Sequence, residues 1–123
     1  MTAGHATTTG RVAAALALLL AAAPAWAEPR VEASVPAANA TVGAPANLFE
    51  VRFNEAVNHY QSRLEILRDG QVLETLRPRL ETEPRFLAAT ARPLAPGSYV
   101  LRWEARSAFD GSVSQGSIPF TVR

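Results

Sequence analysis

The feature that most constrains this chain is a run of regular alternation near its carboxyl end. Every second residue is apolar, and most residues in between are polar, along Tyr99, Leu101, Trp103 and Ala105. Successive side chains of a β-strand point to opposite faces, so this alternation predicts a strand with one buried and one solvent-facing side. The regularity of the pattern favours a central position for this strand in its sheet.

Shorter segments of the same kind recur along the chain, separated by Pro, Gly and Asn. They predict strands at residues 31–35, 49–53, 63–68, 71–76, 86–90 and 118–122. Asp69 and Gly70 stand between two of these segments, and Asp-Gly in that position is a strong signal for a β-hairpin. The stretches 36–45, 54–62 and 107–115 are expected to be loops, residues 92–97 to form a turn, and no segment has the pattern of a long helix.

About seven short strands without helices predict an all-β fold, an immunoglobulin-like Greek-key β-sandwich, with an up-and-down barrel as the alternative. Tyr99 follows Pro96 and Gly97 at the start of the clearest strand. This position favours a tyrosine corner, with the ring inside and the hydroxyl bonded to nearby backbone. Pro119 lacks an amide donor, so the last strand should lie at an edge or carry a bulge there.

The amino-terminal region has a different character. An apolar run from Val12 to Ala23 follows a polar segment that carries Arg11, and it precedes Ala25-Trp26-Ala27, a small-x-small cleavage pattern. The run is too short to cross a bilayer, which needs about 20 apolar residues. We therefore expect a cleavable signal peptide at residues 1–27, cleavage after Ala27, and a mature domain of residues 28–123 that is periplasmic and not inserted in the membrane.

Charge and cysteine content exclude several functions for this domain. Of the 12 basic residues only Arg11 lies in the leader, so the remaining ones balance the 11 acidic residues. A nucleic-acid partner is not expected, because a domain that binds a polyanion shows a basic excess or stripe. The chain has no cysteine. Thiol catalysis, thiolate metal sites and disulfides are thereby excluded, and hydrophobic packing must hold the core.

Candidate catalytic groups are few. His59 is the single histidine after the leader, and it could pair with Glu55 if the local backbone formed a helical turn. An exposed loop histidine is the plainer interpretation. Glu55 directly follows a predicted core strand, where it could accept backbone amides or be solvated. Glu81 and Glu83 lie in a proline-containing, solvated segment instead of a deep cleft. The sequence therefore does not predict an enzyme.

Metal binding is the next candidate, and the supply of ligands is limited. After the leader only His59 provides an imidazole, and the single methionine, Met1, is removed with the leader. A Cu(I) site built from thioethers is therefore excluded, whereas Cu(II) could still use nitrogen and oxygen donors.

Several short motifs follow one another in a distinctive order along the domain. The amino-terminal half contains the segment from Glu28 to Ala40, then Pro45, then Phe53-Asn54-Glu55-Ala56-Val57. The carboxy-terminal half contains Leu94-Ala-Pro-Gly-Ser-Tyr99, Trp103, Ser107, Asp110-Gly111, Gly116, Phe120 and Val122. In order and spacing these motifs resemble the CopC type of copper-resistance proteins, over essentially the whole mature chain.

The resemblance also implies a metal site. In that family Cu(II) is held by an amino-terminal histidine, through its amine and its ring, and by an Asp and a His from the loop before the last strand. Here Glu28 stands in the place of the terminal histidine, Asp110 in that of the aspartate, and Ser112 in that of the second histidine. The spacing from Trp103 to Asp110 is one residue longer than in the family pattern. Since imidazoles supply much of the affinity for Cu(II), weakened binding is expected.

The function implied by the resemblance is that of a periplasmic copper-binding or copper-resistance protein. A monomer is expected, with the copper ion and an inner-membrane copper transport protein as partners. The alternative is a structural or interaction module of the cell envelope that no longer binds metal. The loss of both family histidines motivates this second interpretation.

Overall fold

A computed structural model describes residues 28–123. The predicted leader and its cleavage point fall outside the described residues. The described part contains eight strands and no helix: β1 (Val31–Val35), β2 (Ala40–Val42), β3 (Ala46–Phe53), β4 (Arg63–Arg68), β5 (Gln71–Leu76), β6 (Phe86–Leu94), β7 (Gly97–Arg106) and β8 (Val113–Val122). None of the elements within residues 28–123 is a helix long and apolar enough to span a bilayer.

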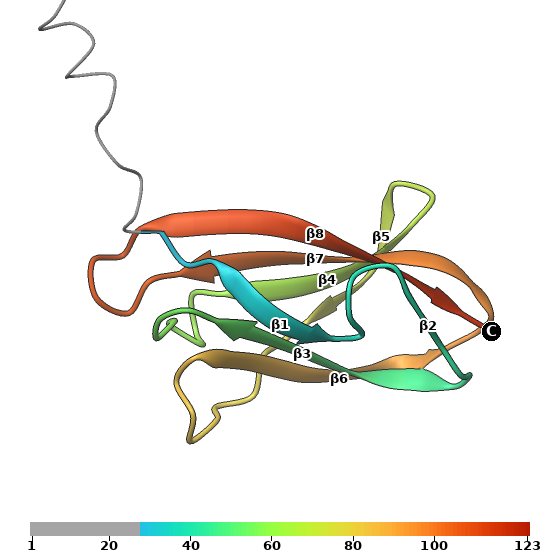
Figure 1. Cartoon of the computed structure of the whole chain (residues 1–123), viewed down its shortest axis with the longest axis horizontal. Helices are drawn as coiled ribbons and strands as arrows, with labels where there is room; N and C mark the ends of the chain where they lie inside the picture. Colours follow the sequence, from blue (N-terminus) through green and yellow to red (C-terminus); the bar gives the residue numbers. More distant parts are fainter. Residues whose placement is uncertain (1–27) are drawn as a thin grey trace, which may run out of the picture.

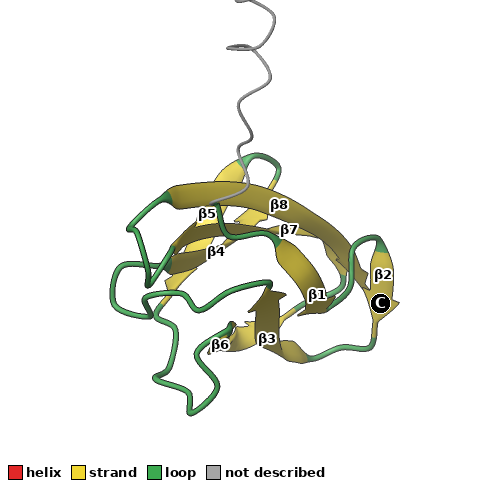
Figure 2. Ribbon diagram, turned by 60° about the vertical axis from the view of Figure 1, so that its left-hand side comes forward, coloured by secondary structure: helices red, strands yellow, loops and turns green. Residues whose placement is uncertain are grey.

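The strands form two facing sheets, seen as two layers in Figures 1 and 2. One sheet has the order β1-β3-β6, and the other has the order β2-β8-β7-β4-β5. All neighbouring strands are antiparallel except β2 and β8, which are parallel. The predicted β-sandwich is therefore confirmed, and the barrel alternative is wrong.

The strand missing from the sequence-based prediction is β2, which lies within the expected loop 36–45. Its three residues pair with the last three of β8, from Ala40 opposite Phe120 to Val42 opposite Val122. Just before β2, the Asn39 amide donates to the Pro119 carbonyl at 2.7 Å. Three residues are too few for an alternation to be recognised, so this pairing became visible only in the fold.

The alternating run near the carboxyl end forms β7, which lies between β4 and β8 as predicted for a central strand. Its apolar residues face the core, where the Trp103 ring meets the Phe53 ring of the opposite sheet edge to face, with centroids 5.2 Å apart. Phe49 of β3 approaches Phe120 of β8 in a similar way, at 5.6 Å. Aromatic side chains thus join the two sheets at two levels of the sandwich.

The hairpin signal is confirmed at the predicted residues. Strands β4 and β5 pair up to Arg68 opposite Gln71, which leaves Asp69 and Gly70 as the two-residue turn. Both turn residues have positive φ angles, 52° and 75°. This backbone is that of a type I′ turn, whose twist matches the twist of the paired strands.

The tyrosine corner is also confirmed. The Tyr99 ring is buried and stacks on Phe120, with centroids 5.7 Å apart. Its hydroxyl donates to the Ala95 carbonyl at 2.7 Å. The Arg68 guanidinium also lies over this ring, 5.4 Å from its centroid. The bend between β6 and β7 is therefore tied to the core through one side chain.

Pro119 lies in β8, which is an interior strand and not an edge strand, and no bulge occurs at this residue. The pairing of β7 with β8 runs without a shift through Val100 opposite Pro119. The Pro119 carbonyl accepts the Asn39 amide on the other side of β8, before the pairs with β2 begin. The N and C=O of a strand residue point to the same side, so the proline nitrogen faces this side of β8, where no ladder donor is needed.

Strands β3, β6, β7 and β8 are longer than predicted, and the difference is largest for β6 and β8. Strand β6 continues through Pro93 to Leu94 and β7 begins at Gly97, so only residues 95–96 of the expected turn at 92–97 lie outside strands. Strand β8 begins at Val113 instead of Ile118, because its first half pairs with β7 although it alternates less clearly. Pairing with a strong neighbouring strand overrides the weak local signal.

Gly116 lies opposite Trp103 in the β7–β8 pair and leaves room for the indole. A Cβ at residue 116 would lie 2.6 Å from Cζ2 and 2.8 Å from Cε2 of Trp103. These distances are shorter than any ordinary contact, and the indole is held on its other side by Phe53. The inter-sheet contact of Trp103 therefore depends on a glycine at residue 116.

We predict that Gly116→Ala lowers the free energy of unfolding by about 1–3 kcal/mol, because the added methyl forces the indole out of its position. Urea unfolding followed by Trp103 fluorescence measures the change. Gly43→Ala is the matched control, since a Cβ there would meet nothing within 4 Å. Equal stability of the two variants would show that the indole moves without cost.

Tyr99→Phe should lower the free energy of unfolding by about 1 kcal/mol, because the Ala95 carbonyl loses its donor. The control is Tyr60→Phe, which removes the same hydroxyl from a residue that is 86% exposed. Thermal or urea unfolding of both variants tests the difference. If Tyr60→Phe destabilises as much as Tyr99→Phe, the corner contributes nothing specific.

Candidate functional site

The amino-terminal end of the described chain lies against the start of β8, as Figure 1 shows. The Ser114 hydroxyl donates a short hydrogen bond to the Pro29 carbonyl. Arg30 and Asn54 are joined twice, by the Arg30 amide to the Asn54 side-chain oxygen at 2.7 Å and by the Asn54 amide to the Arg30 carbonyl at 2.9 Å. These bonds bring Glu28, which precedes Pro29, to the end of the sandwich where β7 turns into β8.

Two loops meet at the same end. The loop after β3 and the loop after β7 form a bridge between Val57 and Ser107. The Asn58 amide donates to the Arg106 carbonyl at 2.9 Å, and the Ala108 amide donates to the Ala56 carbonyl at 3.0 Å. Segments far apart in sequence, at residues 28–30, 54–62 and 107–112, are thereby held as neighbours.

The 107–112 loop is closed by its own hydrogen bonds. The Ser107 amide donates to the Ser112 carbonyl at 2.8 Å, and the buried Ser107 hydroxyl accepts the Phe109 amide at 3.2 Å. Gly111 has a φ of 74°, which favours glycine, and Arg106 Nη1 donates to its carbonyl at 2.8 Å. Sequence reasoning did not identify Arg106 as a loop-holding residue, because it occupies an ordinary polar position of β7.

Asp110 is exposed and takes part in this closure. Its Oδ1 accepts the Ser112 amide at 2.9 Å. The pKa of the Asp110 carboxyl is lowered from its ordinary value of 3.8, first by the Ser112 backbone amide and next by the Ser112 hydroxyl. These bonds favour the charged form of the carboxyl, so Asp110 is an ionised aspartate that also caps its own loop.

The structure thus brings two of the three predicted site residues into contact, Asp110 and Ser112. Glu28 belongs to the same end through its neighbour Pro29, and no contact joins Glu28 to Asp110 among the described residues. Within residues 28–123, no three or more His, Cys, Asp or Glu side chains gather closely enough to hold a metal ion. The three predicted positions do not form a preassembled cage.

The available donors fit a weak cation site better than a tight Cu(II) site. Glu28, Asp110 and Ser112 offer oxygen atoms, and one Asp110 oxygen is already bound to the Ser112 amide. Oxygen donors suit hard cations, whereas imidazole suits Cu(II). High affinity for Cu(II) would need nitrogen donors, and the side chains of these three residues supply none.

His59 does not form the pair with Glu55 that a helical turn would allow. The backbone there bends around the Asn58 side-chain oxygen, which accepts the amides of Tyr60 at 3.0 Å and Gln61 at 3.1 Å. His59 is half-buried instead of exposed, and its Nε2 is buried without a hydrogen-bond partner. Glu55 Oε1 is also buried without a partner, so the expected bonds from backbone amides are not made at that atom.

Comparison with known proteins agrees with the motif order and the fold. The CopC domain family matches residues 31–123. A copper resistance protein C from Xanthomonas campestris pv. juglandis is 34% identical over 132 residues, which cover 96% of this chain and 94% of the relative.

Solved structures give the same result. CopC from Methylosinus trichosporium OB3b superposes with a TM-score of 0.71 and 30% identity, covering 76% of this chain and 92% of that one. PcoC from Escherichia coli, a methionine-rich copper resistance protein, superposes with a TM-score of 0.64 and 24% identity. The superposition covers 79% of this chain and 100% of the PcoC chain, and it shows a shared fold. Since the family match includes every strand from β1 to β8, this chain belongs to the CopC family.

Proposed function

We propose that this protein is a periplasmic copper-resistance protein that binds Cu(II) weakly, through Glu28, Asp110 and Ser112, at the loop end of the sandwich. The observation that carries the proposal is the convergence of residues 28–30 and the 107–112 loop in a CopC-family fold. The relative from Xanthomonas is named for copper resistance, and its similarity extends over nearly the whole chain.

The proposal includes export and processing. A leader at residues 1–27 would be removed after Ala27, which leaves residues 28–123 as the mature domain and a free amine on Glu28. That amine would be the one nitrogen donor of the site. It would lie next to Pro29, whose carbonyl is bound to Ser114 at the start of β8.

The position of the site suits delivery of copper better than storage. Asp110 is exposed, and its loop and the amino-terminal segment lie outside the aromatic core. A cation held there could pass to another protein by ligand exchange without disturbing the packing between the sheets. We infer that the monomer hands copper to an inner-membrane copper transport protein and performs no catalysis itself.

A second candidate function follows from the state of the Asp110 carboxylate. Its oxygen is used by the Ser112 amide, and both family histidines are absent. A domain that no longer binds metal would act as an interaction module of the cell envelope, using the same fold. Recovery of one reproducible envelope partner with metal chelated throughout would favour this function, and strict dependence of that partner on copper would contradict it.

Calorimetric titration of the protein that begins at Glu28 with Cu(II) tests the main proposal. We expect weak binding by the unmodified domain. The double variant Glu28→His and Ser112→His should bind about 100-fold more tightly, which corresponds to about 2.8 kcal/mol, because it restores imidazole donors at two positions. Quenching of Trp103 fluorescence provides a second readout.

Thr41→His combined with Thr90→His is the matched control, since it adds two histidines on exposed residues of different sheets. If this control gains as much affinity as the variant at residues 28 and 112, the proposed positions do not share a site. Absence of any heat from the unmodified domain at micromolar concentrations would exclude direct binding and leave the interaction module.

The pH dependence of the site follows from the lowered pKa of Asp110. The pKa of the Asp110 carboxyl is lower in the folded state than in the unfolded state, so its ionised form stabilises the fold at pH values above the unfolded pKa. This stabilisation is lost as the pH falls through the lower pKa of the folded state. Carbon NMR of the Asp110 carboxyl should therefore show a midpoint below 3.8. In the Ser112→Ala variant the titration midpoint of Asp110 should rise, because the hydroxyl, one of the two Ser112 donors, is lost. A midpoint of Asp110 at 3.8 or above in the unmodified domain would contradict the loop geometry.

A further inference from the structure

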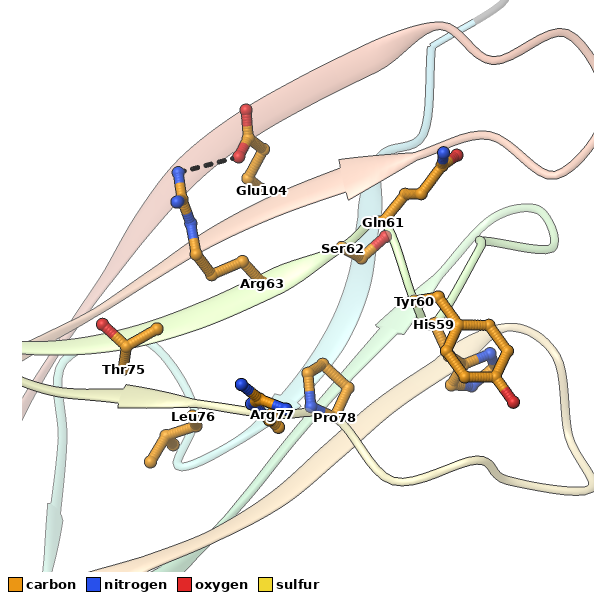
Figure 3. A pocket seen from close by; sticks show the side chains of 10 residues that line it. All are labelled: His59, Tyr60, Gln61, Ser62, Arg63, Thr75, Leu76, Arg77, Pro78 and Glu104. Carbon is orange, nitrogen blue, oxygen red and sulfur yellow. Dashed lines mark hydrogen bonds and ion pairs between the residues drawn. The ribbon is translucent and has the colours of Figure 1, made fainter.

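A second feature lies beside the loop end and shares no residue with the proposed copper site. It is a hollow of about 530 Å³ between the loop after β3 and the end of β5 (Figure 3). The side chains that matter for its chemistry are those of His59, Tyr60, Arg63, Leu76, Arg77 and Glu104. Its volume is in the range of small-molecule sites, which combine apolar walls with a few polar groups.

His59 supplies the first sign of a ligand. Its Nε2 is one of three buried side-chain atoms without a hydrogen-bond partner among the described residues. Buried polar atoms normally have partners, because an unsatisfied one costs free energy. Tyr60, which is 86% exposed, is drawn directly in front of the His59 ring in Figure 3. His59 is itself one of the residues that line the hollow, so its imidazole lies at the wall of the proposed site.

The charges of the lining leave one surplus cation. Arg63 forms an ion pair with Glu104, with Nη2 and Oε2 2.9 Å apart, so these two groups largely neutralise each other. Arg77 is exposed and forms no ion pair among the described residues. A guanidinium presents two parallel donors that match the two oxygens of a carboxylate. An Nε2–H of His59 would add a donor of the same kind.

Apolar surface lies next to these donors. Leu76 and Pro78 form part of the wall, and the Tyr60 ring offers a face on which a flat group could stack. We propose that this hollow binds a small organic acid with an apolar or aromatic body, its carboxylate on Arg77 and His59 and its body against Tyr60. The ligand is bound without copper, so this site is independent of the function proposed above.

Amide NMR of the metal-free domain with benzoate as the probe tests this site. Benzoate should shift the signals of residues 59–63 and 75–78 in a saturable way. Benzamide, which has the same ring without the charge, should bind at least about fivefold more weakly, and so should acetate, which has the charge without the ring. Equal binding of benzamide and benzoate, or shifts that do not saturate, would overturn the proposal.

Variants separate the site from general attraction of anions to arginine. Arg77→Gln should weaken benzoate binding at least about fivefold. Arg85→Gln is the matched control, because Arg85 is also exposed, its side chain forms no ion pair among the described residues, and it lies outside the hollow. Equal loss in the two variants would overturn the proposal.

Substitution of His59 tests the role of Nε2. His59→Ala should weaken benzoate binding, and His59→Gln should retain more of it, because a glutamine amide can donate from nearly the same place. Unfolding followed by Trp103 fluorescence establishes that both variants remain folded. Unchanged benzoate affinity in folded His59→Ala would remove His59 from the site and overturn the proposed mode of binding. Because copper is absent from every sample, failure here leaves the copper proposal unaffected.

Discussion

Contact between aromatic rings of the two sheets is the interaction on which the rest of this structure depends. The domain has no disulfide, so the two sheets depend mainly on packing to stay together. Phe53 meets Trp103 near the loop end, and Phe49 meets Phe120 farther along the sandwich, where Tyr99 of the same sheet stacks on Phe120. The Trp103 contact in turn requires that Gly116 has no side chain. A small domain without covalent links relies on this close fit for its stability.

The loop end is built upon that core by backbone hydrogen bonds together with side-chain bonds from residues such as Ser107, Arg106 and Ser114. Residues 28–30, 54–62 and 107–112 are connected through the Val57–Ser107 bridge and the amide bonds around it. Such bonds depend little on which side chains the loops carry. The family architecture is therefore compatible with Glu28 and Ser112 at the positions proposed above as metal ligands.

Much of the fold could be predicted because its signals are local. Alternation along β7, the Asp-Gly turn between β4 and β5, and the tyrosine near Pro96-Gly97 each depend on neighbouring residues. Strand β2 and the first half of β8 could not be predicted in the same way, since their pairing comes from distant strands. The partial burial of His59 could not be predicted either, because its loop is held against β7 through the Asn58 amide and the Arg106 carbonyl, which are far apart in sequence.

For the candidate site, the sequence by itself determined which donors exist: one imidazole within residues 28–123, no thiol and 11 carboxyl side chains. It also established the order of motifs that the family shares. Only the tertiary structure decided where these groups lie, that Asp110 is bound to the Ser112 amide, and that His59 faces a separate hollow with Arg77. The physical reason is that composition limits the chemistry a chain can perform, whereas proximity between distant segments arises from packing and strand pairing.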